Sequence, residues 1–162
     1  MPTERCYNVL RLHWEVVYAD MTACFCGHSK LYSKYDLVKG KCYEIVRDQI
    51  KKGADSFLIG DHGDFDSLVA SVCFALKKKY PHIEVCLILP YYRPHIDEYT
   101  QQRYNRFDNT ITPPLEDTPY RYRIIKANQY MVDQSDILIA YVCSSGGAAK
   151  TMEYARRKKK YC

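Results

Sequence analysis

The stretch SFLIGDHGDFDSLVASVCFALKKKYPHIEVCLIL, residues 56–89, decides the fold. Its first residues, 56–60, are a short apolar run, and its last, 83–89, are nearly all apolar, as expected of buried parallel strands. The segment between them carries one apolar helical face, formed by Leu68, Val69, Val72, Cys73 and Leu76. Pro81 ends this predicted helix, so the stretch contains the strand–helix–strand unit of an α/β fold.

The same alternation continues on both sides of this unit. Further strands are predicted at 22–26, 136–143 and, as a minor strand, 110–112; further helices are predicted at 36–52 and 120–134 and after Gly147. Alternation with continuous apolar strands predicts a three-layer Rossmann-like parallel sheet with helices on both faces. We expect one such domain over residues 21–162, preceded by an N-terminal arm or extra strand at 1–20.

The balance of charge argues against a nucleic-acid partner. The chain of 162 residues has a net charge of +5, and much of the excess lies in two runs, Lys77–Lys79 and Arg156–Lys160. Both runs fall at the ends of predicted helices, where cations complement the helix dipole. A basic face that binds nucleic acid would be spread along one surface, which is the alternative reading of these runs.

Composition also suggests a cytoplasmic protein without a membrane segment, cofactor or metal. No stretch is apolar enough to span a bilayer, and Arg5, Arg11 and Glu15 interrupt any signal peptide at the start. The eight cysteines include no C-x-x-C pair, and most lie in apolar segments, as does Cys143. Buried free thiols in a reducing compartment explain them best.

Small and polar residues follow three of the predicted strands. They are Gly27, His28 and Ser29; then Gly60, Asp61, His62, Gly63, Asp64 and Asp66; then Ser144, Ser145, Gly146 and Gly147. Because parallel strands end together, these loops are predicted to meet at one edge of the sheet, where ligands bind in such folds.

The third loop has the composition of an anion site. Glycines allow a phosphate to approach the backbone, and the N–H groups of the following helix then donate to it, with the serine hydroxyls as further donors. In the second loop, Asp61, Asp64 or Asp66 would suit a ribose diol. The alternatives are that the glycines only relieve a tight turn and that Asp64 or Asp66 caps the next helix.

Candidate residues also lie on the last two helices. Lys126 and Asn128 are placed to face a phosphate, and Glu153 is the carboxylate nearest the third loop in sequence. The alternative is that each is a solvated residue on the surface of its helix.

Three segments, TACFCGHS, FLIGDHGDFDSLVASVCFALKKKYPHIEVCLILPY and IIKANQYMVDQSDILIAYVCSSGGAAKTMEYARRK, resemble the SLOG superfamily, in particular its short bacterial branch. This superfamily of Rossmann-like proteins includes the lonely-guy enzymes and the DNA-processing-A proteins. The resemblance implies a nucleotide or nucleotide-derived ligand at the strand ends and a homo-oligomer. Gly146 and Gly147 match the paired glycines of the lonely-guy enzymes, and Glu153 stands at the spacing of their catalytic glutamate.

The departures from that pattern shape the expected function. The position of the catalytic arginine falls on Ala127, and the proline before the paired glycines is Ser145. We therefore expect binding of a nucleotide or nucleotide-derived signal, such as an ADP-ribose type molecule, without turnover. The alternative is an enzyme, a nucleoside 5′-monophosphate phosphoribohydrolase that uses Glu153. A weaker alternative is a DNA-associated protein of the DNA-processing-A type.

Overall fold

Strands and helices alternate along the chain as the sequence predicts. The computed structural model describes residues 21–158, so the predicted arm at 1–20 lies outside the described residues. The strands are β1 Met21–Gly27, β2 Ala54–Ile59, β3 Glu84–Ile88, β4 Asn109–Ile111 and β5 Ile137–Tyr141. The α-helices are α2 Tyr35–Lys51, α3 Asp64–Lys79, α4 Glu98–Asn105, α5 Arg123–Asp133 and α6 Gly147–Arg157. Two 3₁₀ turns, η2 Tyr32–Lys34 and η3 Tyr120–Tyr122, precede α2 and α5.

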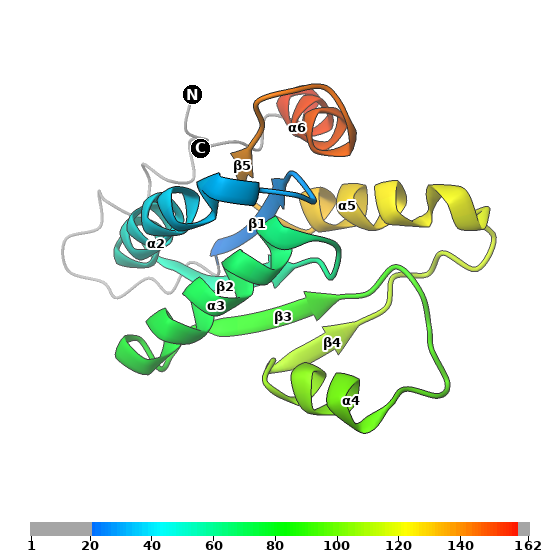
Figure 1. Cartoon of the computed structure of the whole chain (residues 1–162), viewed down its shortest axis with the longest axis horizontal. Coiled ribbons are helices and arrows are strands. Elements are labelled where there is room, and N and C mark those ends of the chain that lie inside the picture. Colours follow the sequence, from blue (N-terminus) through cyan, green and yellow to red (C-terminus); the bar gives the residue numbers. More distant parts are fainter. Residues whose placement is uncertain (1–20, 159–162) are drawn as a thin grey trace.

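The five strands form one sheet in the order β4-β3-β2-β1-β5, and every neighbouring pair is parallel (Figure 1). β1 lies between β2 and β5, with Cys24 opposite Leu58 on one side and Leu138 on the other. The chain reverses its direction of progress across the sheet after β4, when it returns to place β5 beside β1. Ligands of open α/β sheets bind at such a switch in strand order, beyond the carboxyl ends of the strands.

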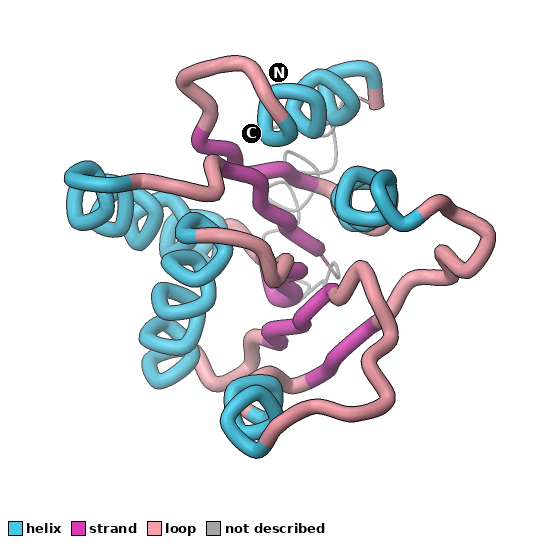
Figure 2. The backbone as a smooth tube through the Cα atoms, turned by 45° about the vertical axis from the view of Figure 1, so that its right-hand side comes forward, coloured by secondary structure: helices cyan, strands magenta, loops and turns pink. Residues whose placement is uncertain are grey.

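Helices cover both faces of the sheet, which confirms the predicted three-layer architecture (Figure 2). One buried cluster lies between the sheet and helices α2 and α3, and it includes Phe25, Phe57 and Leu68. The second lies between the sheet and helices α5 and α6, and it includes Cys24, Met131 and Val132. Alternate residues of β1 thus enter opposite cores, as the pleat of a strand requires.

The structure differs from the sequence prediction in a few details of the helices. Near the start of α2, Leu37 is exposed although it is apolar, whereas its neighbour Val38 is buried. The helix predicted at 120–134 begins as the turn η3 and becomes α-helical only at Arg123. In the part of the chain that the structure describes, no helix is both long and apolar enough to cross a membrane.

Candidate functional site

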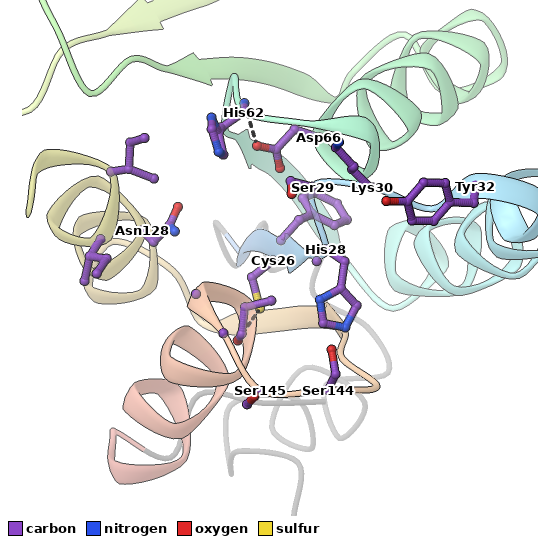
Figure 3. A pocket seen from close by; sticks show the side chains of 17 residues that line it. Cys26, His28, Ser29, Lys30, Tyr32, His62, Asp66, Asn128, Ser144 and Ser145 are labelled. Atoms are coloured by element: carbon purple, nitrogen blue, oxygen red, sulfur yellow. Dashed lines mark hydrogen bonds between the residues drawn. The ribbon is translucent and has the colours of Figure 1, made fainter. Parts of the chain in front are cut away.

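A cavity of about 490 Å³ opens at the carboxyl ends of β1 and β5 (Figure 3). The loops after β1 and β5 both line it, together with two residues, His62 and Asp66, from the region after β2. The remaining wall comes from α5, through Ile124, Ile125 and Asn128. The predicted meeting of small and polar loops at one edge of the sheet is therefore present, and we call this space the elbow cavity.

The loop after β5 is open on its cavity side. Ser144, Ser145, Gly146 and Gly147 are all exposed and all line the elbow cavity. Gly146 is the N-cap of α6 with φ +137°, a backbone conformation that favours glycine. A Cβ added at Gly146 or Gly147 would have no atom within 4 Å, so these glycines leave room rather than fill it. The first turn of α6 therefore borders the elbow cavity, where the helix dipole would stabilise an anion.

His28 fixes this loop to the end of β1. The backbone N–H of Cys143 donates to Nε2 of His28 at 2.8 Å, so the imidazole accepts through that nitrogen. The His28 ring also meets the Tyr141 ring edge-on, with centroids 5.8 Å apart. In Figure 3, His28 points toward Ser144 across the mouth of the cavity. Cys143, predicted to be buried, is exposed, because β5 ends at Tyr141 and the chain has already left the sheet.

The loop after β2 is tied tightly to the loop after β1. Asp64 accepts a hydrogen bond at Oδ2 from the backbone N–H of Leu31 at 3.0 Å, and its own N–H donates to the Ser29 carbonyl at 2.7 Å. Gly63 has φ +95°, and a Cβ there would lie 2.5 Å from the Cα of Ser29. The idea that Asp64 or Asp66 caps α3 is wrong, because Gly63 is the N-cap and no side chain caps this helix.

Asp66 is the acidic group that reaches the elbow cavity. Its Oδ2 accepts from the backbone N–H of His62 at 2.9 Å, and the carboxylate lies over Gly60, where a Cβ would be 2.7 Å away. Burial raises the pKa of Asp66 to about 7, and the hydrogen bond from His62 offsets part of this rise. The side chain is therefore poised to accept or donate a hydrogen bond near neutral pH.

Six of the predicted site residues do not line the elbow cavity, namely Gly60, Asp61, Gly63, Asp64, Lys126 and Glu153. Lys126 is exposed, and its Nζ donates to the side chain of Gln129. Unlike Asn128 on the same helix, it does not line the elbow cavity. Glu153 is exposed on α6 and forms an ion pair with Arg156, one turn further along. Ala127, at the position of the lonely-guy arginine, is buried in the core between α5 and the sheet. The catalytic pattern is thus not assembled around this cavity.

Three of these residues, Gly60, Asp61 and Gly63, line a neighbouring cavity between α3 and α4. The carboxylate of Asp61 is already engaged there, because Arg103 donates to both of its oxygens, at 2.6 and 3.2 Å. Tyr104 also donates to it through its hydroxyl, at 3.2 Å. Asp61 is therefore held by protein groups on the far side of the β2–α3 loop from the glycine elbow.

Sequence reasoning did not select several residues that line the elbow cavity, namely Lys30, Tyr32, Ile124, Ile125 and Ala148. Lys30 and Tyr32 immediately follow the Gly27–Ser29 segment, so their nearness to a glycine at a strand end was an available signal. Ile124 and Ile125 carried no such signal, since apolar residues on a helix normally indicate its core face. Among residues 21–158, no group of three His, Cys, Asp or Glu side chains is placed to hold a metal ion.

The fold and this cavity define a Rossmann-like α/β protein with a polar, glycine-lined space at its strand ends. The chain belongs to the YspA SLOG family, whose family model matches residues 25–161. The predicted membership in the SLOG superfamily is thereby confirmed. A search of curated proteins finds no match to this chain.

Proposed function

We propose that this protein binds a nucleotide or nucleotide-derived signal in the elbow cavity and does not turn it over. The observation that carries the proposal is the exposed Ser144–Gly147 loop, whose glycines leave open space in front of the first turn of α6. A phosphate in that space would accept from backbone N–H groups and from the serine hydroxyls. Membership in the SLOG family supports a nucleotide-related ligand at these strand ends.

The remaining walls suit the other parts of a nucleotide. Asp66 and His62 lie at the end of the cavity nearest β2 and offer hydrogen-bonding groups to a ribose hydroxyl. Ile124 and Ile125 offer an apolar surface to a base, and the amide of Asn128 has both a donor and an acceptor for its edge. A volume of about 490 Å³ lies within the range of about 300–1,000 Å³ typical of small-molecule sites.

The alternative of a phosphoribohydrolase has less support. Cleavage of a glycosidic bond needs a carboxylate beside the sugar, and it needs the phosphate held firmly. Glu153, the residue proposed for that role, is exposed, paired with Arg156 and outside the cavity lining. The arginine position is Ala127, whose side chain faces the core. Both observations favour binding without hydrolysis.

Thermal unfolding with added ligand tests the proposal. We expect at least one of AMP, ADP-ribose and a cyclic dinucleotide to raise Tm by about 5 °C when present at about one hundred times its Kd. Free base released from the same nucleotides is expected to stay at background. If none of these ligands shifts Tm, the binding proposal is wrong, and release of base would favour the hydrolase instead.

A pair of glycine variants tests whether ligand affinity depends on the Ser144–Gly147 loop. In Gly147→Ala, the new Cβ tilts toward the N-terminus of α6, into the space proposed for the phosphate, and we expect Kd to rise about tenfold. Gly40→Ala is the matched control, because Gly40 also lies in a helix with open space around it but lines neither the elbow cavity nor the cavity beside it. Equal Kd values for the two variants would contradict a phosphate at the elbow.

Assembly into a homo-oligomer remains a prediction. Light scattering of the purified protein at several concentrations would test it, and a single monomer mass at all of them would contradict it.

A further inference from the structure

A second cavity, of about 430 Å³, lies between α3 and α4, on the far side of the β2–α3 loop. Three arginines line it: Arg93 from the loop after β3, and Arg103 and Arg106 from α4 and the residue after it. None of the predictions for this chain used these residues. Two guanidinium groups directed at one space are a common way to hold a phosphoryl group, because each presents paired donors in a plane.

The charges of the three arginines are not equivalent. The charge of Arg103 is neutralised by its ion pair with Asp61, so Arg103 lines the cavity without offering a free positive charge. Arg93 and Arg106 form no ion pair with any residue between 21 and 158, so their charges remain available. Arg106 also lies over the Phe74 ring, 4.4 Å from its centroid, which orients the guanidinium without neutralising it.

The wall behind these arginines is apolar. The rings of Phe74 and Phe107 meet edge-on with centroids 4.9 Å apart, and both line the cavity. Aromatic side chains on one side of a charged group exclude water there, and this strengthens its attraction to an anion.

The second cavity lies next to the elbow cavity and shares His62 and Asp66 with it as lining residues. A small space of about 70 Å³ lies between them, lined by His62, Arg93 and Ile124. Ile124 also lines the elbow cavity, Arg93 also lines the second cavity, and His62 lines all three spaces. The carboxyl ends of β5, β1, β2 and β3 therefore carry a row of adjacent cavities, with the glycine elbow near one end and Arg93 and Arg106 near the other.

We infer that this second cavity, which we call the arginine cavity, is a second anion subsite that binds another phosphoryl group of the same nucleotide-derived ligand. This inference rests on the proposed function, and it adds that the ligand is longer than a mononucleotide and carries two separated phosphates. One phosphate lies at the Ser144–Gly147 elbow, the chain of the ligand passes His62, and the other phosphate lies between Arg93 and Arg106.

Calorimetric titration with AMP and with the linear dinucleotide pApA tests the length of the ligand. We expect pApA to bind the wild-type protein at least about tenfold more tightly than AMP, since a phosphate held by two guanidinium groups contributes at least this factor. Replacing both arginines, in Arg93→Gln/Arg106→Gln, should reduce the affinity for pApA to that for AMP. The affinity for AMP should change less than about twofold, because its phosphate lies at the elbow.

A matched variant separates local contacts from net charge. Lys78→Gln/Arg157→Gln also removes two positive charges, from exposed positions near the ends of α3 and α6. We expect it to leave both affinities unchanged within about twofold at 150 mM salt, where exposed distant charges are screened. Equal affinities of the wild type for AMP and pApA would overturn the inference, as would an equal loss in both double variants.

A direct probe of the arginine cavity keeps this inference distinct from the proposed function. Addition of inorganic pyrophosphate should shift the backbone amide NMR signals of Ser67, Ala70 and Ser71, which line this cavity, and the shifts should vanish in Arg93→Gln/Arg106→Gln. No shift at these signals overturns the second subsite even if AMP binds. If these signals shift but neither AMP nor pApA binds, the proposed function fails, and the shared ligand inferred here fails with it.

Discussion

The glycines of the β2–α3 loop and those of the β5–α6 loop are used in opposite ways. At Gly60 and Gly63 an added Cβ would lie within 3 Å of Asp66 and Ser29, so both glycines allow close packing. At Gly146 and Gly147 an added Cβ would meet nothing within 4 Å. The first loop is filled by the protein itself, whereas the second leaves a space. Similar sequence composition at two strand ends therefore has two physical meanings, one structural and one that suits a ligand.

The largest expected effect is at Gly63. Replacement by alanine places a side chain at φ +95° and ψ −176°, a region nearly closed to other residues, and brings its Cβ against the backbone of Ser29. We expect Gly63→Ala to lower the free energy of unfolding by about 3 kcal/mol, measured by urea denaturation. Gly147→Ala should change it by less than about 1 kcal/mol, since alanine suits a helix and the space is open. Similar losses in the two variants would remove the distinction between the loops.

A pH-dependent effect is expected at Asp66. Its pKa is raised by burial to about 7 in the folded protein, against about 4 in the unfolded chain. Between these values the folded state binds more protons than the unfolded state, so the stability from protonated Asp66 is lost as pH rises. From pH 5 to pH 7 the wild type should lose about 2 kcal/mol relative to Asp66→Asn, which cannot ionise.

Urea denaturation of both proteins across this pH range measures the difference. Because all other titrating groups are shared, the difference between the two curves reports on Asp66 alone. A constant difference from pH 5 to pH 7 would show that the carboxyl group ionises normally and is not the neutral donor described at the cavity.

A smaller effect is expected at Asp64. Its carboxylate accepts from the N–H of Leu31, a residue that is itself buried, and thereby joins the loops after β1 and β2. In Asp64→Ala this N–H loses its partner, which should cost about 1.5 kcal/mol of unfolding free energy. Asp64→Asn keeps an acceptor oxygen and should recover most of the loss. If the alanine variant is as stable as the wild type, Asp64 does not join the loops, and a direct role toward a ligand becomes the better explanation.

The sequence predicted the fold more fully than the site. The α/β sheet could be predicted because burial leaves a pattern of apolar residues in the sequence. A strand buried on both faces, such as 83–89, is apolar throughout, and a helix buried on one face, such as that from Leu68 to Leu76, is apolar every three or four residues. The meeting of the strand-end loops followed from parallel topology alone. The sequence could not show which glycines have open space around them and which are packed against other residues. That difference depends on whether residues far apart in sequence, such as Ser29 and Gly63, approach each other. The burial of Asp66 and the position of Arg106 over Phe74 likewise depend on tertiary contacts.

The smallest expected effect is at Glu153. This residue lies on α6, the helix after the open Ser144–Gly147 loop, but it does not line the elbow cavity. Its side chain is exposed and pairs with Arg156 at 3.7 Å, an i, i+3 pair on the surface of α6. Such pairs contribute little, so Glu153→Gln should change the unfolding free energy by less than about 0.5 kcal/mol. The Kd for a bound nucleotide should also stay within about twofold of the wild-type value, because no wall of the cavity changes. A loss of base release in this variant, with binding intact, would instead identify Glu153 as a catalytic carboxylate and require α6 to rotate or shift when the ligand binds.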